Sequence, residues 1–535
     1  MKKIFTLVAA AVMALTVNAK DYKGDLSVTW MGNPLGTQET TISVTEQEDG
    51  KYTLALNNFQ LAKVGGVGNI VLPNVEGIVD NSGNGKTFLA TDQTIEITAG
   101  DDPTIKDWLG PQLGEVPVSV KADMTENNLY AVIKIEGFGG IDVVFGDGGY
   151  QLPNSGFENF HTATYTDGGT DYTSQEPNAW HSFNSGVATG VASILTKNAL
   201  QEGSTSVSED VRESYSTTTP SGTLGTKCVK LTSKKVLGFP ANGTMTTGRL
   251  QAGSISATDA ANCSFFDMTS TDVDGNGDPF YTTLTSKPDA LTVWVKFKQG
   301  KDLGDYKYAT VSAVITDENY YQDPEDQAYT NVVAKAQNAQ IESKDFAWQQ
   351  LTIPFDYASY ASNNVEPKAI LITISTNAHP GSASNDESNP DELYVDDIAL
   401  VYNAGLESLT VKDSEVTLED GTTSYTVSGL SGELTLDDIV AVSDGQGAYV
   451  TKAIETTDDG ATVTITVTSN DYQTVNTWTI NVPGVSTGIE KVETTTENGV
   501  QAIYTLDGRK VSSMNAKGVY IVRKADGTTV KVLKK

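Results

Sequence analysis

Apolar and polar residues alternate along most of this chain, and apolar residues almost nowhere recur at the three- and four-residue spacing of a helix. Runs such as Val116/Val118/Val120 are separated by turn signals such as Asn127-Asn128. Between residues 20 and 148 we expect about eight such strands, each with one apolar face. Their short links predict an up-and-down antiparallel sheet, which loses its exposed edges by closing into a small barrel.

The remaining segments also indicate strands but differ in composition. Residues 149–404 hold most of the aromatic residues, both cysteines and several loops rich in Asp, Asn and Gly. Residues 405–484 carry short, evenly spaced alternating runs, which are typical of a small immunoglobulin-like sandwich. In residues 485–535 basic residues outnumber acidic ones, and Asp507-Gly508 and Asp526-Gly527 are hairpin signals. The predicted fold class is therefore all-β, with several domains in series.

The overall charge excludes some classes of partner. The chain has 68 acidic and 36 basic residues among 535, a formal net charge of −32. An acidic surface repels phosphate groups, so nucleic acid and anionic lipid headgroups are poor partners. Three histidines and two cysteines leave little material for a histidine-rich zinc site or a Cys/His nucleophile.

The first residues predict export. Lys2-Lys3 precede the apolar run from Ile4 to Val17, and small residues lead to Ala19. The run is shorter than the roughly 20 apolar residues of a spanning helix, so we interpret residues 1–19 as a secretory signal peptide. No later window is long and apolar enough to span a membrane. We expect the protein at the cell surface or outside the cell, with the periplasm as the alternative.

Four resemblances follow from these segments. Residues 20–148, with their alternating runs, resemble the calycin-like, lipocalin-type domains of secreted Bacteroidetes proteins. Residues 149–404 open on Gly156-Phe157-Glu158 and close on Val395-Asp396-Asp397-Ile398. This pair of motifs resembles the putative carbohydrate metabolism domain, a galactose-binding-like jelly roll. Residues 405–484 are similar to cadherin-like sandwich modules. Residues 485–535 resemble the sorting domain of type IX secretion, which implies the secretion machinery as a partner; a basic β-tail without that role is the alternative.

Two calcium sites are expected. In the first, side-chain oxygens at alternate positions resemble a calcium loop, although Thr283 stands where an EF-hand has its bidentate Glu; an acidic turn is the alternative. The residues of this loop are Asp272, Asp274, Asn276 and Asp278. The second is implied by the jelly-roll resemblance, in which Glu158 and Asp396 or Asp397 share a structural Ca²⁺. One aspartate facing solvent while the other caps a turn is the alternative there.

Exposed aromatic rings beside polar loops are the residues on which sugars stack, so we expect a glycan surface in residues 149–404. Tyr320 and Tyr321 interrupt the strand pattern and form the sharpest cluster. The expected carbohydrate-binding residues are Trp180, Tyr306, Tyr308, Tyr320, Tyr321 and Tyr329.

The sequence contains no motif that identifies a catalytic site. A glycosidase needs two facing carboxylates, and 68 acidic residues offer too many pairs to select one. His161 and His181 could pair, but surface histidines are the simpler expectation. Cys228 and Cys263 could form a disulfide in an exported protein, although both also fit as small buried residues.

The favoured function is therefore non-catalytic binding of a polysaccharide or glycan at the cell surface. A glycoside hydrolase built on the same segment and an adhesin or structural surface protein are the alternatives.

Overall fold

A computed structural model of the chain describes residues 19–30, 33–47, 50–61, 64–79, 87–135, 140–146, 149–167, 169–194, 203–211, 226–236, 238–301, 304–486, 500–505, 510–511, 518–524 and 529–534. All of the predicted signal peptide except Ala19 lies outside these residues, and so do the two Asp-Gly turns near the C-terminus. Within the described ranges no helix has the length and apolarity to cross a membrane. The described structure is almost entirely strands, which confirms the prediction of an all-β, multi-domain protein.

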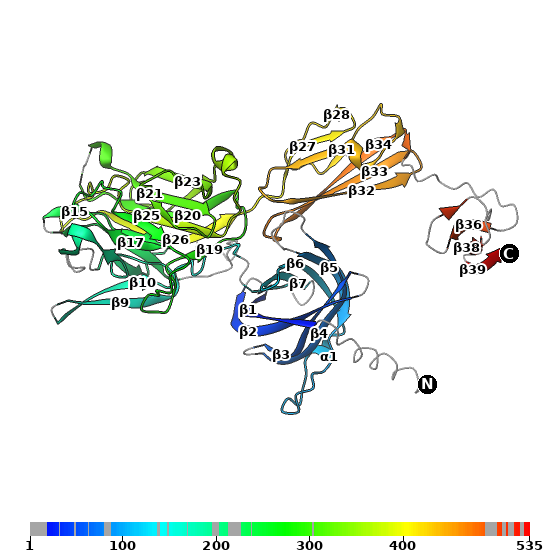
Figure 1. Cartoon of the computed structure of the whole chain (residues 1–535), viewed down its shortest axis with the longest axis horizontal. Helices are drawn as coiled ribbons and strands as arrows, with labels where there is room; N and C mark the ends of the chain where they lie inside the picture. The colour runs from blue at the N-terminus through cyan, green and yellow to red at the C-terminus, as the bar shows by residue number, and fades with distance from the viewer. Residues whose placement is uncertain are drawn as a thin grey trace. The chain divides into compact units, whose positions relative to one another are not determined.

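The first domain is a closed antiparallel barrel in which each strand pairs with the next and the last pairs with the first (Figure 1). Its eight strands are β1 (Ala19–Trp30), β2 (Asn33–Glu46), β3 (Tyr52–Leu61), β4 (Gly65–Val79), β5 (Thr87–Glu96), β6 (Glu115–Met124), β7 (Leu129–Ile135) and β8 (Ile141–Phe145). A single helical turn, α1 (Gly110–Leu113), precedes β6. In β6, Val116, Val118 and Val120 are buried inside the barrel, as the alternating pattern requires.

Barrel closure depends on a glycine directly after β8. The backbone N–H of Gly146 donates to the Asp25 carbonyl oxygen at 2.8 Å, extending the seam between the last and first strands. Its φ is +79°, and a Cβ atom there would lie 2.1 Å from the Leu129 carbonyl oxygen. Only glycine fits this conformation and this approach.

We expect Gly146→Ala to destabilise the barrel by more than Gly50→Ala does. Gly50 has the same φ of +79°, but a Cβ atom added there would meet nothing within 4 Å, so Gly50→Ala carries only the backbone strain of about 1 kcal/mol. Differential scanning calorimetry of the full chain measures both. Equal shifts in the two variants would show that the contact with Leu129 is unimportant.

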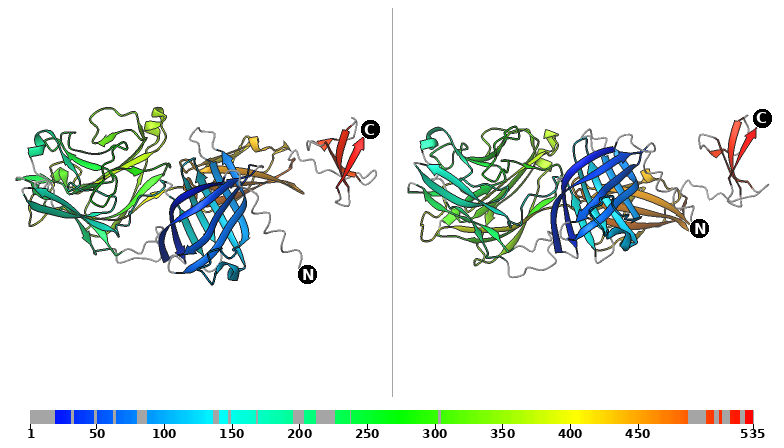
Figure 2. Two further views of the ribbon diagram at one scale, coloured as in Figure 1. Left: turned by 60° about the horizontal axis from the view of Figure 1, so that its bottom comes forward. Right: turned by 90° about the horizontal axis from the view of Figure 1, so that it is seen from below.

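The second domain is a sandwich of two antiparallel sheets (Figures 1 and 2). One sheet has the order β12 (Thr205–Ser208), β13 (Cys228–Thr232), β26 (Glu392–Val401), β20 (Ala290–Lys298) and β24 (Gln349–Pro354). The other has the order β16 (Thr244–Thr246), β25 (Ala369–Ser375), β21 (Ala309–Thr316) and β23 (Val332–Ile341), with β19 (Thr282–Thr283) also on β25. Buried side chains of both sheets form one apolar core between them.

Further strands lie outside this sandwich core. A small sheet has the order β11 (Val187–Ala188), β17 (Arg249–Ala252), β18 (Cys263–Phe266) and β22 (Tyr321–Asp323). Two hairpins are formed by β9 (Phe160–Asp167) with β10 (Thr170–Pro177), and by β14 (Lys234–Val236) with β15 (Phe239–Ala241). Phe266 and Tyr321 of the small sheet pack against Val314 and Leu371 on the outer face of the second large sheet.

The C-terminal part of the chain contains separate small sheets. One sheet has the order β28 (Ser414–Glu415), β27 (Leu406–Val411), β31 (Ile439–Ser443). A second has the order β29 (Ser424–Thr426), β34 (Val475–Pro483), β33 (Gly460–Thr468), β32 (Tyr449–Thr457). A third pairs β30 (Gly432–Glu433) with β35 (Val485–Ser486). The final sheet has the order β37 (Lys510–Val511), β36 (Val500–Thr505), β38 (Gly518–Lys524), β39 (Thr529–Lys534). The chain divides into two compact units, each with more contacts inside it than to the other. The second unit consists of Ser408–Val442, Thr451–Ile465 and Thr477–Lys535.

Candidate functional site

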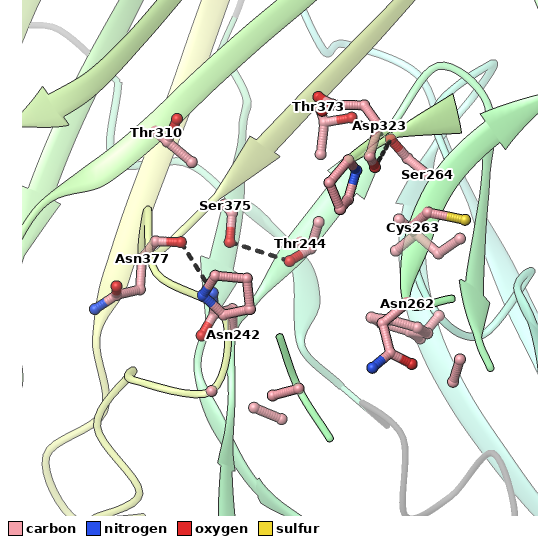
Figure 3. Close-up of a pocket in the computed structure, with 18 of the residues that line it drawn as sticks. Asn242, Thr244, Asn262, Cys263, Ser264, Thr310, Asp323, Thr373, Ser375 and Asn377 are labelled. Carbon is pink, nitrogen blue, oxygen red and sulfur yellow. Dashed lines mark hydrogen bonds between the residues drawn. The ribbon is translucent and has the colours of Figure 1, made fainter. Parts of the chain in front are cut away.

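A cavity of about 610 Å³ lies on the outer face of the β16-β25-β21-β23 sheet (Figure 3). Its floor is a patch of hydroxyl side chains on three neighbouring strands. Thr310 of β21 is opposite Ser375 of β25, and Ser375 is also opposite Thr244 of β16. Ser312 and Thr373 form the next cross-strand pair. Cross-strand partners lie on one face, so these hydroxyls form a continuous polar surface.

Strand alternation explains why the hydroxyls face the cavity. In β21, Val311 and Ala313 are buried in the sandwich core, which turns Thr310 and Ser312 to the opposite face. In β25, Ile374 lies in the core and separates Thr373 from Ser375 in the same way. We call the five residues Thr244, Thr310, Ser312, Thr373 and Ser375 the hydroxyl floor.

Apolar residues border the hydroxyl floor. Phe239 on β15 is 73% exposed, and Ile255 in the loop after β17 is 76% exposed. Both line the cavity, together with Pro240, Leu250 and Pro380. Large apolar side chains this exposed commonly mark a binding surface.

Some polar atoms of the lining have no hydrogen-bond partner in the part of the chain that the structure describes. The Asn242 amide nitrogen donates to the Asn377 carbonyl oxygen at 2.9 Å, whereas the Asn242 side-chain oxygen has no hydrogen-bond partner among the described residues. The same holds for the hydroxyl of Thr310. Groups of this kind can bond a ligand or water.

Asp323, at the end of β22, is the one charged residue among the described residues that line the cavity. The Ser312 hydroxyl donates to its Oδ2 at 2.9 Å. Burial raises the pKa of the Asp323 carboxyl above its ordinary value, although this hydrogen bond and the charge of Lys335 act in the opposite direction. The folded protein therefore binds a proton at Asp323 more readily than the unfolded chain does.

We expect Asp323→Asn to raise the thermal midpoint at pH 7. The pKa of the Asp323 carboxyl is higher in the folded state than in the unfolded chain. The free energy of unfolding therefore falls as the pH rises from the ordinary Asp range through the folded pKa. Asn cannot ionise, so the variant does not lose this stability. The gain should shrink as the pH falls toward about 4, the ordinary range of Asp. Thermal unfolding of both chains across this range is the measurement. A constant difference at all pH values would contradict the ionisation argument.

None of the six predicted carbohydrate-binding aromatics lines this cavity. Trp180 is fully buried, donates its indole N–H to the Pro153 carbonyl at 3.0 Å and packs edge-on against Phe157. Tyr321 is also fully buried. Neither ring can stack on a sugar, so the prediction that Trp180 and Tyr321 bind carbohydrate is wrong.

The other four aromatics keep some exposed surface. Tyr306 and Tyr320 are exposed, whereas Tyr308 and Tyr329 are half-buried. The Tyr306 ring lies 4.2 Å from the His379 ring, measured between centroids. The Tyr320 hydroxyl donates to Gln322 at 3.0 Å. Their role in carbohydrate binding remains a prediction.

We expect Trp180→Ala to destabilise the chain by about 3–5 kcal/mol, the range for deleting a large buried aromatic side chain. Tyr306→Ala, at an exposed site, should change stability by only about 0.5 kcal/mol. Denaturant unfolding compares the two. A small effect at Trp180 would contradict its assignment to the core.

The predicted calcium loop directs its side chains to separate partners. Asp272 pairs with Arg249 at 3.0 Å, and Asp278 accepts hydrogen bonds from the backbone of Ala179 and the side chain of Asn276. One oxygen of Asp274 accepts backbone N–H groups within the loop, and the other lies near two histidines. A calcium ion in this loop remains a prediction.

The residue before the opening motif of the second domain contacts the closing motif. The backbone N–H of Ile398 donates to the Ser155 carbonyl oxygen at 3.0 Å. Glu158, however, accepts the backbone N–H of Lys227 at 3.0 Å, and Asp396 is buried and accepts the N–H of Asp397. Among the described residues, one group of three side chains is placed to hold a metal ion, and it consists of His161, Glu176 and Asp274. Glu158, Asp396 and Asp397 do not belong to it. Calcium at this second position also remains a prediction.

The predicted disulfide is wrong. Cys228 and Cys263 are both free and buried, and they lie on β13 and β18, which belong to different sheets. Burial raises the pKa of each thiol to about 12, so both stay protonated at neutral pH. They fit as small buried residues, the interpretation that the sequence favoured over a disulfide.

The residues of the cavity were missed, although the sequence carries a signal for some of them. Thr310-Val311-Ser312 and Thr373-Ile374-Ser375 alternate hydroxyl and apolar side chains, which predicts a polar outer face on each strand. Nothing in the sequence shows that these faces are neighbours. Phe239, between Gly238 and Pro240, is an aromatic residue in a turn-like context that the sequence pattern does not distinguish from the others.

Two family models match the chain. Residues 19–146 match the calycin-like beta-barrel domain, and residues 156–401 match the putative carbohydrate metabolism domain. Neither match covers half of the chain. The closed barrel lies in the segment that matches the calycin-like beta-barrel domain, and the cavity with its hydroxyl floor lies in the segment that matches the putative carbohydrate metabolism domain.

The wider comparisons are weaker. No curated protein sequence matches the chain significantly. A putative outer membrane protein from Bacteroides fragilis, solved by crystallography, is 10% identical with a TM-score of 0.17, over 67% of this chain and 96% of that chain. The structure of PNGF-II in a C2 crystal form is 7% identical with a TM-score of 0.11, over 71% of this chain and 67% of that chain. Both TM-scores are too low to support an inference.

Proposed function

We propose that the carbohydrate metabolism domain binds a neutral oligosaccharide in the cavity above the hydroxyl floor, without cleaving it. The observation that carries this proposal is the pairing of the hydroxyl floor with the exposed ring of Phe239. A sugar presents hydroxyl groups that both donate and accept hydrogen bonds, and it presents apolar C–H faces. The cavity offers one surface suited to each.

The size and charge of the cavity support the same ligand class. A volume of about 610 Å³ falls within the about 300–1,000 Å³ typical of small-ligand pockets, enough for a short oligosaccharide. The described lining contains no Lys or Arg, and Asp323 is its one charged residue. Sulfated or carboxylated sugars would meet no cation there, so neutral sugars are favoured.

The lining favours binding over hydrolysis. A glycosidase of the usual kind needs two carboxyl groups, about 5 Å or about 6.5–9.5 Å apart across the sugar. Asp323 has no carboxylate partner among the described lining residues. We therefore place the protein among non-catalytic accessories that capture glycans. A predicted signal peptide and a sorting-like C-terminal tail support a site of action outside the inner membrane.

We expect Phe239→Ala to weaken oligosaccharide binding by at least about 10-fold, because removing a ring from a stacking contact costs about 1.5 kcal/mol or more. A glycan array with the full chain identifies a ligand, and titration calorimetry gives the affinities. Thr310→Val, which removes only a hydroxyl from the floor, should also weaken binding.

The matched control is Tyr320→Ala, which deletes an exposed aromatic ring outside the cavity lining. This variant should bind as the unmodified chain does. Loss of binding at Tyr320 with full binding by Phe239→Ala would move the site away from the cavity. A folded chain that binds no glycan on the array would overturn the carbohydrate proposal. If that chain still supports adhesion of cells, the adhesin alternative is favoured. Release of cleaved sugar would instead favour the hydrolase.

A further inference from the structure

A second cluster of polar side chains lies apart from the hydroxyl floor, on the β9–β10 hairpin. His161 of β9 is directly opposite Glu176 of β10 in the antiparallel register. The loop that contains Asp274 reaches the same place, and so does His181, whose backbone pairs with that of Thr246 in an isolated bridge. Residues from three separate segments therefore converge on this position.

The separations in the cluster are short but do not form hydrogen bonds. His161 Nε2 lies 3.2 Å from Asp274 Oδ2 and 3.6 Å from Glu176 Oε2. His181 Nε2 lies 3.4 Å from the same Asp274 oxygen. None of these atom pairs meets the geometry of a hydrogen bond, and N–H···O bonds usually measure about 2.9–3.0 Å.

Several of these polar atoms are buried without a partner. His161 Nε2, both ring nitrogens of His181 and Asp274 Oδ2 have no hydrogen-bond partner among the described residues. The side chains of His181 and Asp274 are fully buried, and that of His161 is 10% exposed. A buried polar atom without a hydrogen bond raises the free energy of the folded state. Because these atoms lie close together, they indicate a bound species that contacts all of them.

We propose that His161, Glu176, Asp274 and His181 form a zinc site. Around Zn²⁺, ligand nitrogen and oxygen atoms lie about 2.0–2.2 Å from the metal, which places neighbouring ligands of a tetrahedron about 3.3–3.6 Å apart. The observed separations are 3.2, 3.4 and 3.6 Å. The ligand atoms of His161, Glu176 and Asp274 all lie within 4.8 Å of one another. His181 lies outside this group, with its Nε2 near Asp274 Oδ2, so its ring would move toward the other three ligands to complete the tetrahedron.

Hydrogen bonds outside the cluster orient its members. His161 Nδ1 bonds Asn178 Oδ1 at 3.2 Å, which turns Nε2 toward the centre. Glu176 accepts hydrogen bonds from the backbone and hydroxyl of Ser182 and from the hydroxyl of Ser185. Partners of this kind fix the ring and carboxylate orientations in metal sites.

The donor set favours zinc over calcium. Calcium takes about six to eight oxygen ligands, whereas two imidazole nitrogens with two carboxylate oxygens suit a four-coordinate zinc ion. Two neutral histidines, two carboxylates and one Zn²⁺ also carry no net charge, which suits a buried position. Two protonated histidines in place of the metal are the competing account.

The site would be structural. It joins the β9–β10 hairpin, the Asp274 loop and the segment that begins at His181. Phe183 in that segment lines the cavity, so the metal would hold one wall of the candidate sugar site in place. The zinc proposal does not depend on a sugar being bound there.

The test is titration of the full chain, freed of metal by a chelator, with Zn²⁺ alone in a calorimeter. We expect one zinc ion per chain and a higher thermal midpoint in its presence, whereas any response to Ca²⁺ alone should be the same in His161→Gln as in the unmodified chain. His161→Gln should weaken zinc binding by more than about 10-fold, and Asn178→Ala by about 10- to 100-fold. Co²⁺ in place of Zn²⁺ should give the visible absorption typical of a tetrahedral site.

His379→Gln is the matched control, because His379 bonds Ser382 and lies outside the cluster. This variant should bind zinc as the unmodified chain does. Asp274→Asn, which keeps the shape of the side chain, provides a second variant if His161→Gln fails to fold. A folded chain that binds no zinc, or binds it equally well after both substitutions, would overturn the proposal and favour the protonated histidines. A calcium response that His161→Gln abolishes would overturn the choice of metal.

Discussion

The sandwich of the second domain depends on one apolar core shared by its two large sheets. Neighbouring strands of the second sheet bury every second residue in that core, as Val311 of β21 and Ile374 of β25 show. Because side chains alternate between the faces of a strand, this burial fixes which residues point outward. A shift of one residue in either strand would bury the hydroxyl floor and expose the core.

The outer face created in this way is divided between two environments. At one end, Val314 and Leu371 pack against Phe266 and Tyr321 of the small sheet. Farther along the same two strands, threonines and serines replace the apolar residues, and the face remains open as the cavity. Leu371 and Thr373 are two residues apart on one strand, so a change of side-chain polarity marks where packing ends and the candidate site begins.

Periodicity in the sequence was sufficient to predict the strands, the barrel and the all-β class, because each of these depends on local alternation. It could not show which strands are neighbours. His161 and Glu176 are cross-strand partners, but Asp274 reaches them from about one hundred residues away, so the cluster is invisible before folding. The acidic residues around Asp274 by themselves suggest calcium. The two histidines that face Asp274 are distant in the sequence, so the sequence does not suggest zinc.

The aromatic residues show a second limit of local reasoning. Trp180 lies in a polar, turn-rich stretch, yet its ring fills the core and its indole N–H bonds a backbone carbonyl. Phe239 lies in a similar context and is exposed. Whether an aromatic side chain in a loop is exposed depends on which other segments pack against that loop. Those segments are known only from the complete fold. The same reason explains why Cys228 and Cys263 looked compatible with a disulfide before their sheets were known.

The most direct test of the central claim is a crystal structure of the chain with a bound oligosaccharide. The account predicts a sugar ring against Phe239, with sugar hydroxyls within hydrogen-bond distance of Thr310 and Ser375. A sugar bound on the Tyr306 or Tyr320 surface, with the hydroxyl floor left to water, would contradict it.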